Sequence, residues 1–378
     1  MKVLALGGCG QEGKITVKDL IKSEDVSRLV IGDINLENAD KFKAELANDK
    51  VSTLHVDVND HDTLVAAMKE ADVVVNFAGP FYKHGVKAIE AAIEAKKDYL
   101  DICDDYDATR DMLALDEKAK AAGITAVIGL GASPGVTNLF AKHGADKLDQ
   151  VDEIEVKWVV AITDVDEPGA SAAMYHGLHM IDGNVPQYLD GKLQDVPALT
   201  DSEMVVFPEI GESEVYYVGH PEPATLPLYI KGLKECTCKG GVPGLDEGLK
   251  VFSALGLTGA EPIDIGGNKV APKDIAMTLL DALPMPEELP PALSGFMVWI
   301  RGTEGGDSVE YVYTVYGRMS PWTGIPASIG TQMLGKGEIP TKGVLAPEGC
   351  VDTTRFFAEI AKRGMEVEEV EQRIRILK

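Results

Sequence analysis

Cysteine, long apolar runs and runs of basic residues are all scarce in this chain of 378 residues. The five cysteines are odd in number and have no repeated spacing, so they predict no disulfide framework and fit a reducing cytoplasm. No stretch approaches the roughly 20 apolar residues that span a bilayer. The formal net charge is −25, which repels a nucleic-acid backbone and an anionic membrane surface. We therefore expect a cytoplasmic protein that binds neither nucleic acid nor membranes.

The rest of the composition is that of a globular protein, and at roughly 150 residues per domain the length predicts about two domains. In the first third, short β-branched runs alternate with amphipathic segments, which is typical of βαβ units and a parallel sheet. Six strands of this kind fit a complete dinucleotide-binding domain of the Rossmann type. The predicted strands are 3–6, 28–33, 51–57, 73–76, 98–101 and 124–128, and the predicted helices include 61–69, 86–95 and 110–121.

The pattern changes at about residue 151. Residues 153–163 and 309–316 alternate or nearly alternate between apolar and polar side chains, and proline and glycine become frequent between them. Alternation predicts a largely antiparallel sheet with one covered face, and hence a second, α+β domain in the middle of the chain. After Trp322 the pattern is helical again, and the acidic run at 366–371 is interpreted as a solvated helix face.

A GxGxxG pattern follows the first predicted strand and opens a helix. In this pattern Gly8 allows the tight turn, Gly10 lets the backbone approach a pyrophosphate, and Gly13 permits close packing of helix and strand. Gln11 and Glu12 fall at the start of the helix, whose N-terminus holds the phosphate charge. The segment therefore predicts a dinucleotide site.

Two acidic residues follow the next predicted strands. Asp33 follows Gly13 by 20 residues, where a ribose-binding acid is expected. A carboxylate there accepts from ribose hydroxyls and repels a 2′-phosphate, and neither Ile34 nor Asn35 supplies a cation, so NAD is preferred over NADP. The alternative for Asp33 is a helix-capping or turn carboxylate. Asp57 lies beside the adenine or caps the next helix.

The fourth predicted strand ends in a segment with glycine and proline at the carboxyl edge of the sheet, where ligands bind. We expect cofactor contacts from Asn76, Ala78, Gly79 and Pro80. Tyr82 stacks on the nicotinamide or binds substrate, the alternative being ordinary packing.

Several of these segments resemble the saccharopine dehydrogenase-like oxidoreductases: GGCGQEG, NFAGPFY, YLDICDD and GLGASPGVTN. EVYYVGHPEPATLP and GVLAPEG are similar to the L-lysine 6-dehydrogenase branch of that group. The resemblance implies an α/β protein with a Rossmann-type, doubly wound parallel sheet formed by residues 1–138 and 322–378. It also implies an inserted α+β domain, residues 139–321, that binds substrate and carries a dimer contact, so a homo-oligomer is expected.

The resemblance further implies hydride transfer between a nicotinamide and a carbon bonded to nitrogen, which needs a group that manages one proton. Asp101 and His220 are the candidates, with Tyr82 beside them. Thr225 follows His220 in the GHPEPAT segment and is a predicted substrate contact. The alternatives are a loop-ordering carboxylate for Asp101 and a satisfied core histidine for His220.

The GASPGVTN segment has the form of a loop that feeds the N-terminus of a helix. Unsatisfied amides there bind carboxylate or phosphate, so Pro134, Gly135 and Val136 are predicted cofactor contacts and Thr137 a predicted substrate contact. The alternative is proline in the first helical turn with serine or threonine capping.

No metal site is expected. His176 and His179 are three residues apart but have no third ligand in the sequence, and Cys236 and Cys238 lack a second cysteine pair for zinc.

The leading functional hypothesis is NAD-dependent oxidative deamination of the ε-amine of lysine or a related diamino acid. One alternative is an imine reductase of the saccharopine or carboxynorspermidine type. The extra carboxylates of such substrates favour arginine clamps, and Arg301 and Arg318 are the only arginines between residues 149 and 322. A second alternative is an NAD-binding sensor without turnover.

Overall fold

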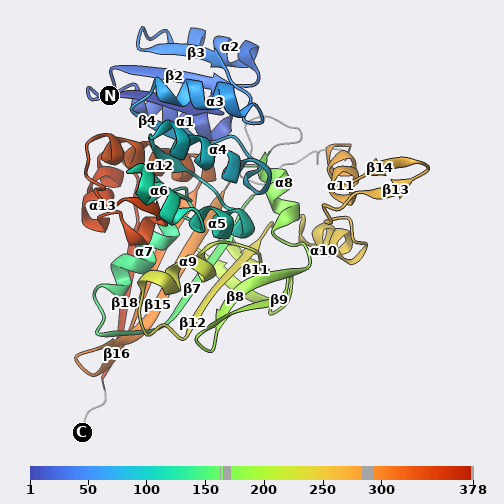
Figure 1. Ribbon diagram of the computed structural model, residues 1–378. Helices are drawn as coiled ribbons and strands as arrows, with labels where there is room; N and C mark the ends of the chain where they lie inside the picture. Colours follow the sequence, from blue (N-terminus) through green and yellow to red (C-terminus); the bar gives the residue numbers. More distant parts are fainter. Residues whose placement is uncertain (162, 165–171, 283–292, 376–378) are drawn as a thin grey trace. The chain divides into compact units, whose positions relative to one another are not determined.

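The computed structural model describes residues 1–161, 163–164, 172–282 and 293–375 (Figure 1). The chain divides into two units. The first comprises Met1–His143 and Ser320–Glu366, and the second comprises Gly144–Met319 and Val367–Lys378. Each unit is built around its own sheet. Within the described residues, no helix is long and apolar enough to cross a membrane.

The first unit contains a parallel sheet of seven strands in the order β17-β6-β5-β4-β1-β2-β3. The order places β1 between β2 and β4, which is the strand reversal at which doubly wound sheets bind dinucleotides. This confirms the predicted Rossmann-type fold. A seventh strand, β17, comes from the C-terminal part of the chain and pairs with β6. The strands are β1 (Lys2–Leu6), β2 (Arg28–Asp33), β3 (Val51–His55), β4 (Val73–Asn76), β5 (Asp98–Asp101), β6 (Thr125–Val127) and β17 (Gly343–Leu345).

Helices connect these strands, and later helices complete the unit. The single helix predicted over 110–121 is two helices, α5 and α6, and Gly123 ends the second in the left-handed conformation (φ 76°). The helices are α1 (Gln11–Leu20), α2 (Leu36–Leu46), α3 (His61–Lys69), α4 (Phe81–Ala95), α5 (Tyr106–Leu113), α6 (Asp116–Ala122), α7 (Val136–Ala145), α12 (Met319–Gly335), α13 (Thr353–Lys362) and the 3-10 turn η1 (Pro347–Gly349).

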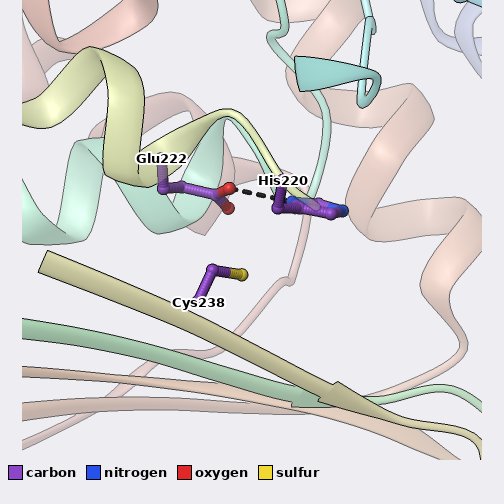
Figure 2. A group of neighbouring side chains, drawn as sticks. All are labelled: His220, Glu222 and Cys238. Carbon is purple, nitrogen blue, oxygen red and sulfur yellow. Dashed lines mark hydrogen bonds and ion pairs between the residues drawn. The ribbon is translucent and has the colours of Figure 1, made fainter. Parts of the chain in front are cut away.

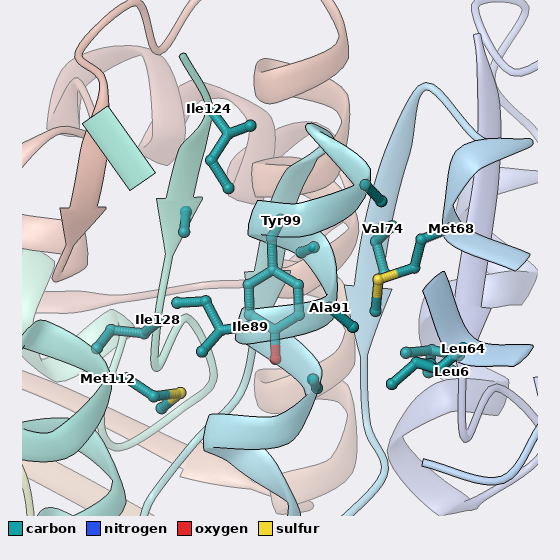
Figure 3. Close-up of a cluster of buried hydrophobic side chains, with 14 of the residues drawn as sticks. Leu6, Leu64, Met68, Val74, Ile89, Ala91, Tyr99, Met112, Ile124 and Ile128 are labelled. Carbon is teal, nitrogen blue, oxygen red and sulfur yellow. The ribbon is translucent and has the colours of Figure 1, made fainter. Parts of the chain in front are cut away.

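An apolar cluster between the sheet and α3 to α6 forms a core of the first unit. Figure 3 shows the ring of Tyr99, which is fully buried, beside side chains that include Ile89 and Met112. At about 25 cal/mol per Å² of apolar surface removed from water, each such ring or branched chain contributes roughly 1.5–3 kcal/mol. Tyr99 carries its hydroxyl to the carboxyl edge of the sheet, so the core also positions a polar group at the candidate site.

The second unit contains a nine-stranded mixed sheet whose main path is β10-β11-β12-β7-β15-β16-β18, with β8 and β9 added beside β12. All its pairings are antiparallel except β12 with β7, which confirms the largely antiparallel prediction. The strands are β7 (Gln150–Val159), β8 (Asn184–Leu189), β9 (Lys192–Pro197), β10 (Glu203–Phe207), β11 (Gly211–Tyr217), β12 (Glu235–Gly241), β15 (Ser294–Glu304), β16 (Asp307–Gly317) and β18 (Glu368–Ile374).

Among the described residues, four helices and a hairpin accompany this sheet: α8 (Ala172–His179), α9 (Glu222–Tyr229), α10 (Asp246–Ala254), α11 (Pro272–Asp281), and β13 (Ile263–Ile265) with β14 (Asn268–Val270). The long hairpin of β15 and β16 turns at Gly305 and Gly306. Both have positive φ, which only glycine adopts without strain, and the two-residue turn pairs Glu304 with Asp307.

The acidic run at 366–371 was predicted as a helix face, and this prediction is wrong. Most of it lies in β18, which pairs with β16 along seven residues. Its β-branched residues Val370 and Ile374 favour a strand, and Lys147 and Arg373 balance part of its acidity through Glu369 and Glu371. Because β18 belongs to the sheet of the second unit, the last residues of the chain fall in that unit rather than with the Rossmann fold.

Candidate functional site

The glycine-rich loop between β1 and α1 has the geometry of a phosphate cradle. Gly10 is the N-cap of α1 and brings no capping side chain, and anion binding at this helix N-terminus stays a prediction. A Cβ on Gly13 would lie 2.5 Å from the Gly7 carbonyl oxygen and 2.7 Å from the Gly8 Cα. The positive φ of the tight turn falls at Gly7 rather than at the predicted Gly8.

The side chains of Gln11 and Glu12 turn toward α12. The Gln11 amide donates to the Ser320 hydroxyl over 2.6 Å, and that hydroxyl donates to Glu12 over 3.1 Å. These contacts bind the loop to the C-terminal part of the first unit, and the cofactor contacts predicted for these two positions stay predictions.

Asp33 ends β2, and both of its carboxylate oxygens are held. Oδ1 accepts from the Asn35 amide and Oδ2 from the Cys9 thiol, each over 2.9 Å. Asn35 caps α2 by accepting from Asn38. The helix-capping alternative for Asp33 is therefore wrong, while its bond to the Asn35 amide is that of a turn carboxylate.

Asp57 does not cap α3. Its Oδ1 accepts from the backbone and side-chain nitrogens of Asn59, and the bond to the backbone lowers the pKa of Asp57. Asp60 caps α3 instead, by accepting from Thr63. The capping alternative for Asp57 is wrong, and the adenine contact stays a prediction.

A hydrogen-bonded chain links the ends of β4 and β5. The side-chain amide of Asn76 donates to the Tyr99 hydroxyl over 2.9 Å, and that hydroxyl donates to the Asp101 carboxylate over 3.0 Å. The Asn76 oxygen accepts from the Ala78 amide, which fixes the backbone before Gly79 and Pro80. Pro80 is the N-cap of α4. The predicted cofactor segment is thus held rigidly at the strand reversal.

Asp101 is fully buried and works as a loop-ordering carboxylate. Its Oδ1 accepts from the amides of Gly129 (2.8 Å) and Cys103 (3.1 Å), and its Oδ2 accepts from Tyr99. Burial raises the pKa of Asp101 to about 6, against the opposing effect of these donors. The carboxylate joins the ends of β5 and β6, which matches the alternative to its predicted catalytic role.

The amides predicted to bind an anion at the start of α7 are occupied within their own loop. The Gly135 amide donates to the Asn138 side chain, Val136 to the Gly131 carbonyl, and Thr137 to the Ala132 carbonyl. That part of the prediction is wrong. Gly135 has a φ of 120°, and a Cβ there would lie 2.3 Å from the Gly131 oxygen, so the glycine serves the loop's close approach beside Pro134.

Tyr82 lies in the first turn of α4 and is partly exposed. Its amide donates to Asp105 over 2.8 Å, and the Lys83 ammonium lies 5.5 Å from the centre of its ring. The contacts with nicotinamide and substrate stay predictions.

In the second unit, His220 forms a dyad with a residue that the sequence reasoning missed. Its Nδ1 lies 2.8 Å from Oε2 of Glu222, and both side chains are buried. Because an ionised carboxylate only accepts, Nδ1 is the donor in this contact, and in the neutral imidazole the lone pair is then on Nε2. In Figure 2 the ring extends away from Glu222 on the Nε2 side. The spacing His-x-Glu at the entry to α9 was the available signal.

Aromatic rings and a thiol surround this dyad. The ring of His220 lies 5.4 Å from the ring of Trp158 and 5.3 Å from that of His176. Gly240 makes room for the Trp158 indole, since a Cβ there would lie 2.4 Å from it. Thr225, on the first turn of α9, is also buried. His220 is therefore an oriented imidazole in a packed aromatic setting.

Cys238 lies below the dyad on β12 (Figure 2), and burial raises the pKa of its thiol well above the ordinary value. Ligand atoms of Cys238, His220 and Glu222 lie within 4.8 Å of one another. Within the described residues this group has three members, one fewer than the four ligands of a closed zinc site, and its carboxylate and imidazole are bonded to each other. We interpret it as a hydrogen-bonded dyad with a thiol packed beside it.

The two histidines singled out as a possible metal pair have different neighbours. His176 lies against His220, whereas Nδ1 of His179 lies 3.2 Å from the Lys273 ammonium. Cys236 and Cys238 form no disulfide, and both lie on the side of β12 that faces α9. Arg301 is bonded to three glutamates, Glu153, Glu155 and Glu310, and Arg318 to the buried Asp164.

The glycine cradle, the acid at the end of β2 and the strand order define an NAD(P)-binding oxidoreductase fold. Two family models match the chain: the saccharopine dehydrogenase NADP binding domain over residues 3–127, and the saccharopine dehydrogenase C-terminal domain over residues 131–365. The chain belongs to the saccharopine dehydrogenase family.

Similar proteins include carboxyaminopropylagmatine dehydrogenase from Synechocystis sp. (24% identical, covering 98% of both chains) and carboxynorspermidine synthase from Vibrio alginolyticus (25%, 98% of both). Carboxynorspermidine synthase from Vibrio cholerae is 26% identical over 89% of this chain and 86% of its own. Among solved structures, apo saccharopine dehydrogenase (L-Glu forming) from Saccharomyces cerevisiae has a TM-score of 0.72 at 18% identity, covering 98% of this chain and 99% of its own. That structural likeness shows the shared fold.

Proposed function

We propose that this protein transfers hydride between NAD and the C–N bond of an amine that carries a carboxyl group, as an imine reductase does. The observation that carries the proposal is the buried pair of Glu222 and His220, which provides an oriented group for one proton. It is supported by the relatives over nearly the whole chain, whose names denote amines that bear a carboxyl group. In the proposal, the first unit holds the cofactor and the second manages the proton.

The chemistry of the reaction requires such a group. When an amine is oxidised to an imine, the C–H bond breaks with its electron pair and the nitrogen loses a proton. A bound nicotinamide accepts or supplies the hydride. Nε2 of His220 takes the proton on oxidation and returns it on reduction, and the Glu222 carboxylate stabilises the imidazolium formed in between.

The finer choice of cofactor is also a proposal. We infer that NAD is used, because the ionised Asp33 carboxylate accepts from ribose hydroxyls and opposes a 2′-phosphate. Ile34, which follows it, is 62% exposed and offers no charge to a phosphate. We further propose that the second unit carries the substrate site, with Thr225 in it, and the contact of a homodimer.

A second candidate function is oxidative deamination of the ε-amine of lysine or a related diamino acid. One observation favours it: Arg301 and Arg318 are already engaged by carboxylates of the second unit. Clamps for a substrate with several carboxylates would have to come from elsewhere. The GHPEPAT segment around His220 gives the same indication.

A panel of amines decides between these functions. Purified protein is incubated with NAD and, separately, with carboxynorspermidine, carboxyaminopropylagmatine, saccharopine and lysine, and NADH is followed by absorbance. NADH from one of the first three supports the imine reductase, and NADH from lysine alone supports deamination. Tight binding of NADH without turnover of any of the four would overturn both and favour a sensor.

The dyad is tested in the same assay. His220→Gln should lower kcat at least 100-fold with unchanged affinity for NADH, since general acid–base catalysis contributes roughly 10²–10⁴-fold. Glu222→Gln should lower it less, because the imidazole is kept but its charged form loses a partner. His61→Gln, on the exposed start of α3, is the matched control. Full activity of His220→Gln would contradict the proposed role.

A further inference from the structure

The thiol of Cys9 is bonded directly to the acid that reads the ribose. Cys9 stands between the glycines of the phosphate cradle, is 9% exposed, and lies with its sulfur 2.9 Å from Oδ2 of Asp33. This contact joins the β1–α1 loop to the end of β2. The two segments bind different parts of a dinucleotide, the pyrophosphate and the adenosine ribose.

The direction of this hydrogen bond follows from the chemistry of its partners. An ionised carboxylate accepts only, so the thiol donates. Burial and the neighbouring Asp33 raise the pKa of the Cys9 thiol to about 12, so the donor keeps its proton at neutral pH. On the other oxygen, the Asn35 amide donates. Two fixed donors, one on each oxygen, therefore hold the carboxylate in a single orientation.

We propose that Cys9 is a positioning residue that sets cofactor selectivity: its thiol fixes the Asp33 carboxylate so that the remaining lone pairs accept from an adenosine ribose diol. The fixed carboxylate also keeps its negative charge where a 2′-phosphate would have to lie. This inference rests on the NAD preference proposed above and adds the residue that enforces it.

The surroundings of the pair give a 2′-phosphate little compensation. The positive charge of Lys14, on α1, opposes the rise in the pKa of the Cys9 thiol. Its ammonium lies 5.9 Å from the centre of the Phe42 ring. A carboxylate released from Cys9 would be able to rotate, and its charge would no longer be held against the phosphate. Loss of the thiol should therefore weaken NADH binding and relax discrimination against NADPH.

The test is direct titration of NADH and NADPH by fluorescence, without substrate, on the wild-type protein and on Cys9→Ala and Cys9→Ser. Loss of one hydrogen bond to a charged group predicts about tenfold weaker NADH binding for Cys9→Ala, with NADPH binding unchanged or tighter. Cys9→Ser keeps a donor and should stay within about twofold of wild type. Cys350→Ala, another free cysteine of the first unit, is the matched control, and thermal melting checks that each variant is folded.

The other outcomes overturn either the role of Cys9 or the proposed cofactor. An unchanged ratio of the two affinities in Cys9→Ala, in a wild-type protein that prefers NADH, would overturn the role of Cys9. The role of Cys9 would also be overturned if Cys9→Ser lost selectivity as fully as Cys9→Ala. Selectivity would then depend on a property of the cysteine side chain other than its hydrogen-bond donor. Wild-type preference for NADPH would instead overturn the proposed cofactor. None of these readings depends on turnover, so failure of the amine panel leaves them intact.

Discussion

At the residue scale, glycines of one motif serve different physical purposes. Gly13 has no room for a side chain because its Cβ would meet backbone atoms of Gly7 and Gly8, whereas a Cβ on Gly10 would meet only the Gly7 oxygen at 3.3 Å. The fold therefore requires a glycine at position 13, whereas the space around Gly10 is compatible with its predicted role of letting the backbone approach a pyrophosphate. The motif predicts the site, but the pattern alone does not separate these two roles.

This difference gives a prediction for two alanine variants. Gly13→Ala should destabilise the protein by about 1–3 kcal/mol, because backbone must move to accept the methyl group. Gly10→Ala should cost less than about 0.5 kcal/mol yet weaken NADH binding at least tenfold, since the methyl group covers the path to the pyrophosphate. Urea unfolding and NADH titration measure the two effects. Equal losses of stability in both variants would contradict the assignment.

Asp101 shows how burial changes the meaning of a motif residue. The YLDIC segment predicts an acid at the sheet edge, and the acid is there, but both its oxygens bind donors from Tyr99, Cys103 and Gly129. Its folded-state pKa of about 6 exceeds the usual value of an unfolded chain. The folded state therefore binds this proton more tightly than the unfolded state does.

The sign of the resulting pH dependence is fixed by that difference. Stability contributed by protonated Asp101 is present at low pH and is lost as the pH rises from about 4 to about 6. Between pH 5 and 8 the wild type should lose about 1 kcal/mol that Asp101→Asn does not lose. Urea unfolding of both proteins across this range measures the difference. Parallel pH profiles would show that Asp101 is ionised with an ordinary pKa.

At the element scale, the sequence predicted the bounds of α3 correctly at 61–69 but did not identify the residue that caps this helix. Asp57 and Asp60 both precede α3, and either satisfies the composition of an N-cap. Only Asp60 has its oxygen at the Thr63 amide, because Asp57 is already bonded to Asn59. A choice between two acids three residues apart depends on backbone dihedral angles, which the pattern does not contain.

The stability of α3 distinguishes the two acids. Asp60→Ala should cost about 1 kcal/mol, the usual loss when an N-cap carboxylate is removed. Asp57→Ala should cost less than half of that, because its bonds lie within an exposed loop. Chemical unfolding of the paired variants compares them under identical conditions. A larger loss for Asp57→Ala would place the cap one turn earlier.

Strands were better predicted than helices, with one instructive exception. Central parallel strands of the first unit such as β1 and β4 are short apolar runs that are almost entirely buried, and such runs are visible in the sequence. β18 is exposed along its length, and its acidic residues hide the strand pattern. The strand is defined by its antiparallel pairing with β16, in which Tyr311 for example pairs with Glu371. Pairing with a distant strand is not encoded in the local sequence.

At the scale of the whole molecule, the sequence was sufficient for the family, the Rossmann-type sheet and the inserted mixed sheet. The sequence was not sufficient for the group proposed to transfer the proton. His220 was singled out, but its partner Glu222 was not, because the two residues flank Pro221 and follow no helical or strand periodicity. The amides before α7 were misjudged for a similar reason, since their acceptors, among them the Asn138 side chain, are defined only by the folded loop.

The central claim is that the protein moves a hydride between a carbon bonded to nitrogen and NAD. It is tested most directly by label transfer. Carboxynorspermidine and lysine are each deuterated at the carbons beside the reacting nitrogen and incubated with the protein and NAD. The mass of the NADH formed is measured by mass spectrometry. The account predicts NADH that is heavier by one deuterium from at least one of these substrates. Unlabelled NADH from a labelled compound that is oxidised would contradict it, as would the absence of NADH from these two compounds and from the rest of the amine panel.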